Sequence, residues 1–404
     1  MRTILAMAAG KTLRFLLRRV RRGGGSALPG TLAYKIQPLL LENAIASAPL
    51  GLVVVSGSAG KSSTTKILVE LLRAHGLKVF TNPSTANIRQ GFYAAILQFA
   101  DLRGRIDADI VVMEWDEGHG AAFSQTLKPR LAVLTNVLSD QLDRFIDPVY
   151  VVEKLATIAG NSVQIVFNRD DNNLSQFAAS HPNSLGFGLG EELVKIGPDY
   201  ALNFGEHPEL SRDCLVESAT DGQLELRVKG RLVKLSGDYE SLPNALNTAA
   251  AVLAAGELTS LDFAKVVSTI ETLPPVFARD ETAIIRGRRV RLMLVQNPTS
   301  FQLNLDKLNT TPTPLMLMAG RDIHDPSWLW TVDFSKLSKV DVVGGFNAYE
   351  LALRLFSAGV EVSQVIPEID KANEAFLRLE GDSATILFSA DAMRRTRRYL
   401  GLAK

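Results

Sequence analysis

The sequence predicts an α/β fold made of two domains, each built on a mainly parallel sheet. From residue 51 to about 170, short apolar strands rich in β-branched residues alternate with helical segments. A second alternation of the same kind runs from about residue 284 to the end. Between them, Leu273-Pro274-Pro275 is a sequence typical of a domain boundary. Alternating short strands and helices indicate parallel strands with helices covering both faces of the sheet.

Each element is predicted from its own apolar pattern. In the first alternation we expect strands at 53–55, 78–81, 110–114, 131–135 and 163–168, and helices at 66–75, 91–99 and 149–159. Residues 224–228 and 232–235 predict a hairpin around Lys229-Gly230-Arg231, and 244–272 is helical. In the second alternation we expect strands at 290–295, 315–318, 340–343, 362–366 and 386–388, with helices after 297–298, at 347–358 and at the end.

Composition excludes several classes of protein. A chain of 404 residues that is 46% hydrophobic is long enough for two or three domains with their own cores. The net charge of +1 does not favour a nucleic-acid partner. The single cysteine, Cys214, excludes a disulfide framework and a multi-cysteine zinc site. The five histidines lack metal-ligand spacing, and no apolar run is long enough to span a membrane.

The first 25 residues interleave basic and apolar side chains. Basic residues alternate with leucines at helical spacing, so we interpret the segment as a basic amphipathic helix rather than a signal peptide. Such a helix can lie on an anionic lipid surface, or it can pack on the first domain with its basic face in water. From residue 11 onwards, the basic residues of this segment are Lys11, Arg14, Arg18, Arg19, Arg21 and Arg22.

The most informative segment is Gly57-Ser58-Ala59-Gly60-Lys61-Ser62-Ser63, which follows the apolar strand 53–55. A tight glycine turn between a strand and a helix directs backbone N–H groups and the helix N-terminus at an anion. Lys61 can bridge the outer phosphates of a nucleotide, and the Ser62 hydroxyl can bind magnesium. The spacing is shorter than that of the usual P-loop, and an ordinary strand-to-helix turn is the alternative.

Four further positions are candidates for the same site. Glu114 ends a strand and can complete magnesium coordination opposite Ser62. Asn136 follows the next strand and can contact a base edge or a metal-bound water. Asn244 and Asn247 lie three residues apart on one helical face, where they can hold a nucleotide or cap the helix. Each has a plain structural alternative. Glu114 can belong to an acidic loop at a strand end, Asn136 to a capped helix start, and Asn244 can simply cap its helix.

Arg279 belongs to the domain boundary at 276–281. An arginine there can reach a terminal phosphate when two domains close, and otherwise it is an exposed linker residue.

These segments, in this order, resemble the Mur ligase superfamily, and within it the MurT family, the ligase-like subunits of lipid II isoglutaminyl synthases. The opening 22–30, the stretch 140–144 (Asp-Gln-Leu-Asp-Arg), and the C-terminal stretches 297–298, 325–330 and 350–360 match the MurT pattern. The resemblance covers nearly the whole chain. It implies a Mur ligase-like fold with a P-loop central domain and a Rossmann-like C-terminal domain.

By resemblance, the site residues take specific roles. Gly57, Gly60, Lys61, Ser62 and Ser63 would bind the phosphates of ATP, with Ser62 and Glu114 on Mg²⁺. Asn136, Asn244 and Asn247 would lie at the nucleotide, and Arg279 at its terminal phosphate. An aspartate would complete the catalytic triad of a glutaminase partner of the GatD type, and the matching stretch offers Asp322 and Asp325, of which we favour Asp325.

The chain departs from the family at three points. MurT proteins commonly carry a four-cysteine zinc ribbon, whereas this chain has only Cys214, so no zinc is expected. The loop has Ser-Ala and Ser-Ser where Thr-Asn and Thr-Thr are usual, which preserves the hydroxyls. Gln296 stands where lysine is frequent.

The resemblance implies an ATP-dependent amide ligase. It would phosphorylate the α-carboxylate of D-glutamate in the lipid II stem peptide and let ammonia from a heterodimeric glutaminase partner attack the acyl phosphate. Cys214 has no obvious histidine partner, so another chain must supply the ammonia. Two alternatives stay open: a Mur or folylpolyglutamate-type ligase that adds an amino acid, and a non-catalytic nucleotide-binding scaffold.

The expected domains are a basic N-terminal segment at 1–30, an ATP-binding central domain at 31–275 with a variable insert at 171–240, and a C-terminal domain at 276–404. The expected location is the cytoplasm, with a peripheral contact at the inner face of the membrane.

Overall fold

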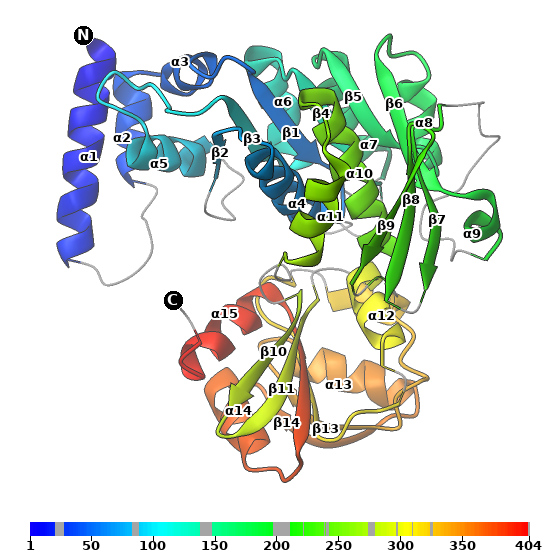
Figure 1. Ribbon diagram of the computed structural model, residues 1–404. Coiled ribbons are helices and arrows are strands. Elements are labelled where there is room, and N and C mark those ends of the chain that lie inside the picture. The colour runs from blue at the N-terminus through cyan, green and yellow to red at the C-terminus, as the bar shows by residue number, and fades with distance from the viewer. Residues whose placement is uncertain are drawn as a thin grey trace. The chain divides into compact units, whose positions relative to one another are not determined.

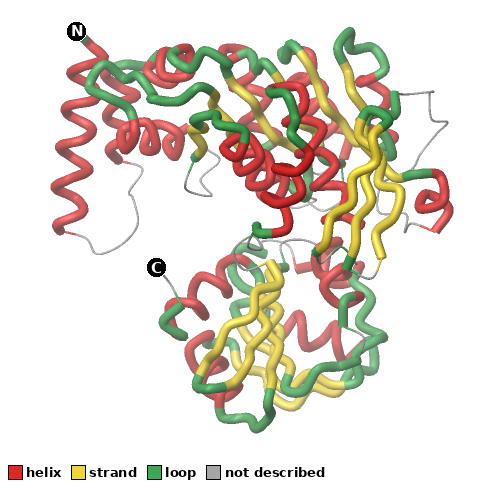
Figure 2. The backbone as a smooth tube through the Cα atoms, viewed as in Figure 1, coloured by secondary structure: helices red, strands yellow, loops and turns green. Residues whose placement is uncertain are grey.

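The computed structural model describes residues 1–20, 28–82, 89–137, 148–196, 211–220, 222–237, 239, 242–273, 279–295, 298–308, 310–323 and 326–402. The described chain divides into two compact units, one ending at Leu273 and one that includes the residues from 279 onwards. Each unit contains one sheet covered by helices, as Figures 1 and 2 show. The predicted class, α/β with two mainly parallel sheets, is therefore confirmed.

The first unit has a nine-stranded sheet in the order β2-β3-β1-β4-β5-β6-β7-β8-β9. The strands are β1 (Leu52–Ser56), β2 (Val79–Thr81), β3 (Ile110–Glu114), β4 (Leu131–Leu134), β5 (Gln164–Asn168), β6 (Ser184–Leu189), β7 (Cys214–Thr220), β8 (Gln223–Val228) and β9 (Arg231–Ser236). Its helices are α1 (Arg2–Val20), α2 (Leu28–Ile36), α3 (Leu40–Ala46), α4 (Lys61–Ala74), α5 (Arg89–Phe99), α6 (Glu117–Leu127), α7 (Pro148–Gly160), α8 (Asn172–Ala178), α9 (Glu191–Ile196), α10 (Leu242–Leu258) and α11 (Phe263–Glu271).

The strand order reverses direction at β1. The chain builds β2 and β3 on one side of β1 and then places β4 on its other side, and all these pairs are parallel. In a parallel sheet, such a reversal leaves a crevice at the carboxyl ends of the strands, where ligands bind. The loops after β1, β3 and β4 therefore meet at one edge of the sheet.

The stretch 171–240, which we expected to be a variable insert, extends this same sheet. β6 pairs in parallel with β5 and β7, and β7, β8 and β9 continue as an antiparallel meander. The predicted hairpin is β8–β9. The alternating burial of β8 and β9 is typical of strands with one buried face. The strands β6 and β7 were not predicted, because glycine and polar residues interrupt their short apolar runs.

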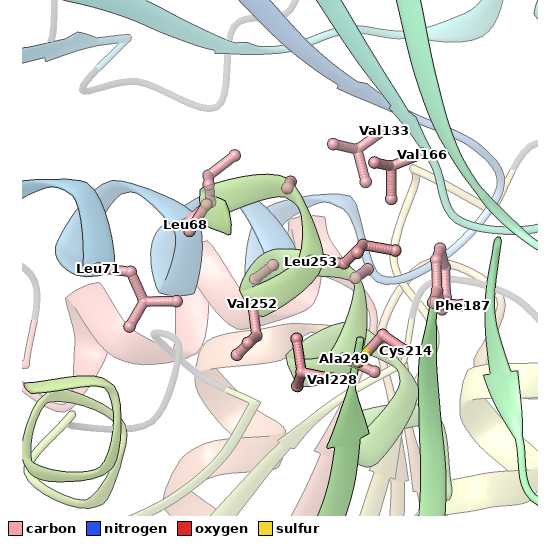
Figure 3. Packing of buried hydrophobic residues seen from close by; sticks show 14 of the residues in the cluster. Leu68, Leu71, Val133, Val166, Phe187, Cys214, Val228, Ala249, Val252 and Leu253 are labelled. Atoms are coloured by element: carbon pink, nitrogen blue, oxygen red, sulfur yellow. The ribbon is translucent and has the colours of Figure 1, made fainter. Parts of the chain in front are cut away.

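The core of the first unit forms where α4 and α10 pack on the sheet. Figure 3 shows Leu68 and Leu71 of α4 and Ala249, Val252 and Leu253 of α10 turned toward one another and toward the strands. Helix α10 is buried on nearly all sides, and its many alanines have small side chains that allow neighbouring elements to approach closely. A helix that is apolar all round belongs in a core. This packing fixes α10 against α4, the helix that follows the glycine loop.

The second unit has a six-stranded sheet in the order β10-β11-β15-β12-β13-β14. Its elements are β10 (Arg279–Ile285), β11 (Arg288–Leu294), α12 (Pro298–Asp306), β12 (Leu315–Met318), the 3₁₀ helix η1 (Pro326–Thr331), β13 (Lys339–Gly344), α13 (Ala348–Ser357), β14 (Glu361–Ile366), α14 (Ile369–Leu377), β15 (Ser383–Phe388) and α15 (Ala390–Tyr399). Only β10 runs antiparallel to its neighbour. One apolar cluster joins α12, η1 and α13 to one face of this sheet, and another joins α14 and α15 to the other face.

Candidate functional site: a glycine loop at the end of strand β1

The loop 57–60 joins β1 to α4 and depends on two glycines in conformations that other residues avoid. Gly57 has φ 129° and Gly60 has φ 84°. A β-carbon on Gly57 would lie 2.3 Å from Thr135 Oγ1, and one on Gly60 would lie 2.1 Å from Asn247 Oδ1. Both positions thus need glycine for its backbone freedom and for its small size. The loop brings the chain to the start of α4 at Lys61, where Gly60 is an N-cap without a side chain.

Residues after β4 hold the loop in place. The Asn136 side chain accepts a hydrogen bond from Ala59 N (2.8 Å) and donates one to Ala59 O (3.2 Å). Thr135 Oγ1 donates to the same carbonyl at 2.7 Å, and Ser58 N donates to Asn136 O at 2.9 Å. The predicted residue Asn136 therefore lies at the loop, where its amide sets the loop's shape.

A buried carboxylate supports this arrangement from β5. Asp171 caps α8 by accepting from Asn173 N and Leu174 N, and its second oxygen accepts from Val137 N at 2.6 Å. Burial raises the pKa of Asp171 to about 6, although these backbone hydrogen bonds act in the opposite direction. Asp171 thereby fixes the backbone beside Asn136. Sequence reasoning missed it, and its only local signal was an aspartate in the capping position after a strand.

Lys61 is the cation of the site, and its partner was not predicted. Its ammonium donates to Glu117 Oε1 at 2.8 Å, to Ser58 O at 3.1 Å and to Gly57 O. The Lys61 side chain is 13% exposed and that of Glu117 only 1%. Glu117 Oε2 is buried and finds no hydrogen-bond partner among the described residues. The pair and the two carbonyl contacts keep the lysine side chain folded against the glycine loop.

Glu117 reaches the loop because α6 begins immediately after β3. Asp116 caps this helix through a hydrogen bond from His119 N at 3.3 Å, which makes Glu117 its first residue. The sequence singled out Glu114 in the same acidic stretch but gave no reason to expect a helix here. The apolar residues of α6 follow a pattern too weak to mark it.

Glu114 lies where the prediction put it, at the carboxyl end of β3. It is half-buried and pairs in register with Val55, two residues before Gly57. Trp115 N donates to Val55 O at 2.9 Å and Ser56 Oγ donates to Trp115 O at 3.1 Å, which ties the two strand ends together.

Ser62 is the second residue of α4 and lies in its first turn. Carboxylate and hydroxyl oxygens are the ligands that Mg²⁺ prefers, with phosphates and water completing its octahedron. Within the ranges that the structure describes, no group of three or more His, Cys, Asp and Glu side chains forms a metal site by itself.

The two asparagines of α10 differ in their positions. Asn247 is buried with its Oδ1 against Gly60, and it accepts a hydrogen bond from Thr64 Oγ1 at 3.3 Å. Asn244 is half-buried inside the first turn of α10, which begins at Leu242, so it does not occupy the capping position. Its carbonyl accepts from Thr248 Oγ1 at 2.9 Å. The structure thus places Asn247, but not Asn244, in contact with the glycine loop.

The remaining candidates belong to the second unit. Arg279 begins β10, so its backbone is part of a strand, while its side chain lies outside the described residues. Asp322 Oδ1 accepts a hydrogen bond from Ser389 Oγ at 2.6 Å, which engages this carboxylate within its own domain. Asp325, Gln296 and the stretch 140–144 lie outside the described residues.

Comparison with known proteins agrees with this geometry. The Mur ligase middle domain model matches residues 55–255, and the MurT ligase C-terminal model matches residues 294–393. The MurT subunit of the glutamine-hydrolysing lipid II isoglutaminyl synthase of Streptococcus pneumoniae is 26% identical over 410 residues, covering 90% of this chain and 89% of that protein. The chain belongs to the MurT family of the Mur ligase superfamily. The Staphylococcus aureus (strain COL) MurT subunit is 25% identical over 422 residues, covering 95% and 93% of the two chains.

Solved Mur ligases share the same fold. The MurF ligase of Thermotoga maritima, solved in complex with ADP, matches with a TM-score of 0.67 and 20% identity, over 95% of this chain and 86% of that one. MurF from Acinetobacter baumannii matches with a TM-score of 0.69 and 14% identity, over 94% and 80%. This likeness concerns the fold of the chain.

Proposed function

We propose that this protein is the ligase subunit of a glutamine-hydrolysing lipid II isoglutaminyl synthase, working in the cytoplasm with a glutaminase subunit. It would use ATP to convert the α-carboxylate of D-glutamate in the lipid II stem peptide into an amide. One observation carries the proposal: Lys61 opens a helix behind a two-glycine loop at the strand-order reversal, in a chain that MurT subunits match along nearly its whole length.

The glycine loop is suited to the phosphates of ATP. Its shape is set by hydrogen bonds with Thr135 and Asn136, which occupy the N–H groups of Ser58 and Ala59. The other N–H groups of the loop would then need little reorganisation on binding. The dipole of α4 favours negative charge at its start. Lys61 is poised beside the loop, and to meet the phosphates its ammonium would exchange Glu117 for phosphate oxygens. The ADP bound by the Thermotoga maritima MurF ligase is in line with this role.

We expect a magnesium ion to accompany the nucleotide at this site. Ser62 and Glu114 would hold it, and the ion would supply charge neutralisation on the phosphates. Lys61 would add a second positive charge at the transferred group. Arg279 would contact the terminal phosphate, and Gly57, Gly60 and Ser63 would contribute backbone N–H groups.

The chemistry then needs two substitutions. A carboxylate oxygen attacks the γ-phosphorus of ATP and ADP leaves, which gives an acyl phosphate. Ammonia attacks the acyl carbon, phosphate leaves, and a proton is lost to give the amide. Water competes with ammonia for the acyl phosphate, so the site has to exclude it.

The ammonia must come from another chain, because this one has no usable thiol. Its only cysteine, Cys214, is fully buried in β7, and burial raises the pKa of its thiol. A glutaminase nucleophile has to be an accessible thiolate. The name of the Streptococcus pneumoniae relative, a subunit of a glutamine-hydrolysing enzyme, points to the same division of labour.

An exposed aromatic surface on the second unit is our candidate for the glutaminase contact. Tyr349, Leu353 and Phe356 are exposed on one side of α13, while Leu351 and Leu355 fill the core on the other side. Trp330 of η1 is exposed as well, and the Arg354 guanidinium lies 5.7 Å from its ring. Asp325, our candidate for the partner's triad, directly precedes η1 in the sequence.

The reaction is tested with lipid II, ATP and either ammonium or glutamine plus the glutaminase subunit, with release of ADP as the readout. Lys61→Ala should abolish turnover with both nitrogen sources. ADP release only after addition of an amino acid would instead indicate an amino-acid ligase, and no release under any condition would indicate a nucleotide-binding scaffold.

The partner's triad is tested with Asp325→Asn, which should keep the ammonium reaction and lose the glutamine reaction. Asp382→Asn, an exposed aspartate elsewhere in the same unit, is the matched control and should keep both. Equal loss of both reactions in Asp325→Asn would contradict the role in the triad.

The docking surface is tested with Leu353→Ser combined with Phe356→Ser. This variant should bind the glutaminase subunit at least tenfold more weakly and keep its ammonium-dependent activity. Ile284→Ser is the matched control, because Ile284 is equally exposed but belongs to β10, at the opposite edge of the sheet from β14. Unchanged affinity in the double variant would contradict the assignment.

A further inference from the structure

Helix α1 is firmly attached to the first unit by one face. Ala6 and Met7 are fully buried, and a β-carbon on Gly10 would lie 2.5 Å from Leu97 Cδ2, so α1 approaches α5 closely at this point. Lys11 Nζ donates to Ala100 O at 2.7 Å. Figure 1 shows α1 at the edge of the unit, beside α2 and α5. The helix therefore presents a fixed outer face.

That outer face is apolar and exposed. Leu5 is 60% exposed, Phe15 56% and Leu16 52%, and Ile4 is also exposed. At about 100° per residue, these side chains fall on the side of α1 opposite Ala6, Met7 and Gly10. The Arg19 guanidinium lies 4.4 Å from the centre of the Phe15 ring, so a positive charge borders the apolar strip. Large apolar side chains gathered on one exposed face indicate a binding surface.

The charge of this part of the chain identifies what the surface would bind. The first 41 residues contain eight of the 44 Lys and Arg residues and none of the 43 Asp and Glu residues. The segment thus carries a net charge of +8, while the remaining 36 basic and 43 acidic residues leave −7 for the rest. An apolar strip with basic residues and no acidic ones complements a surface that is both hydrophobic and anionic.

We propose that the outer face of α1 docks this protein on an anionic lipid bilayer. Leu5, Phe15 and Leu16 would enter the boundary between headgroups and acyl chains, and Arg2 and Arg19 would pair with lipid phosphates. The helix would lie in the plane of the membrane, since no helix among the described residues is long and apolar enough to cross it. The inference does not depend on the ligase activity, although docking would bring the glycine-loop domain to a lipid-linked acceptor.

The proposal is tested by sedimenting the full-length protein with vesicles. We expect it to pellet with phosphatidylcholine vesicles that contain about one third phosphatidylglycerol, and to stay in solution with pure phosphatidylcholine. Raising the salt concentration should release it, because the headgroup attraction is screened.

Two variants separate the apolar from the electrostatic contribution. Leu5→Glu combined with Leu16→Glu should weaken binding at least tenfold, and Arg2→Gln combined with Arg19→Gln should weaken it by about fivefold per charge removed. Val163→Glu is the matched control, since Val163 is 63% exposed on the same unit before β5, and it should bind as the wild type does. Circular dichroism and ATP binding should be unchanged in all three variants.

Other outcomes would overturn the proposal. The bilayer is excluded if the wild type fails to bind anionic vesicles, or if Val163→Glu loses binding as strongly as the double glutamate variant. If light scattering shows self-association that the glutamate variant abolishes, and vesicles bind nothing, the face belongs to a second copy of the chain.

Discussion

Replacing Gly57 by alanine tests whether the loop's shape makes the nucleotide site. The added β-carbon would lie 2.3 Å from Thr135 Oγ1 and 2.9 Å from Asn136 O, and the latter is a backbone atom that cannot swing away. Thr135 would have to give up its 2.7 Å hydrogen bond to Ala59 O inside a buried environment, at a cost of about 1–3 kcal/mol. The backbone strain at φ 129° adds on the order of 1–3 kcal/mol.

Gly76→Ala is the control that isolates backbone strain. Gly76 follows the same helix, α4, with φ 89°, and a β-carbon there meets nothing within 4 Å. It should cost about 1 kcal/mol and lower the melting temperature by about 2–4 °C without changing ATP affinity. Gly57→Ala should cost about 4 kcal/mol, which corresponds to a fall of roughly 10 °C, and should weaken Mg-ATP binding more than tenfold.

Differential scanning fluorimetry measures the two melting temperatures, and isothermal titration calorimetry measures ATP affinity. The reasoning is refuted if Gly57→Ala melts within the range of Gly76→Ala and binds ATP like the wild type. That result would mean that the loop adapts freely and that its hydrogen bonds to Thr135 and Asn136 do not shape the site.

Three further predictions concern buried groups. Glu117→Gln removes the charge that holds Lys61, so it should lower the stability of the ATP-free protein. Because Glu117 would no longer compete with phosphate for Lys61, the rise in melting temperature that Mg-ATP produces should become larger. An unchanged rise would contradict this competition. The pKa of Asp171 is raised to about 6 from an ordinary 3.8, so the folded state binds more protons than the unfolded state between these pH values. The contribution of Asp171 to the free energy of unfolding therefore falls, by up to about 3 kcal/mol, as the pH rises through that window. Asp171→Asn should remove that part of the slope, and urea midpoints at pH 4 and pH 7 that shift equally in both proteins would contradict it. Cys214 is buried and its pKa is raised, so a disulfide reagent should label it only after denaturation; rapid stoichiometric labelling of the native protein would show that β7 opens.

Local patterns in the sequence were sufficient for elements whose signals are local. The strands at 110–114 and 315–318 coincide with β3 and β12, because an uninterrupted β-branched or apolar run between polar residues marks a buried strand. The glycine loop between a strand and a helix could also be predicted from the sequence. Turn geometry requires glycine there, and phosphate binding favours lysine and serine. The start of α4 was missed by several residues, because the hydroxyl residues that open it are poor helix formers.

Contacts that join distant segments could not be predicted in this way. Asn247 meets Gly60 only because α10 packs against α4, and Asp171 meets Val137 only because β5 lies beside β4. Glu117 faces Lys61 only because β3, which α6 follows, lies beside β1. Nothing within a few residues of any of these side chains encodes its partner.

The amino-acid sequence alone determined the fold class, the position of the glycine loop and the family resemblance that suggests an amide ligase. These three depend on spacing, periodicity and residue type within short stretches of sequence. The tertiary structure decided which carboxylate holds the lysine, which asparagine covers the loop and which face of the first helix remains uncovered. Those choices follow from how helices and strands pack, and packing depends on shape complementarity between residues far apart in the chain.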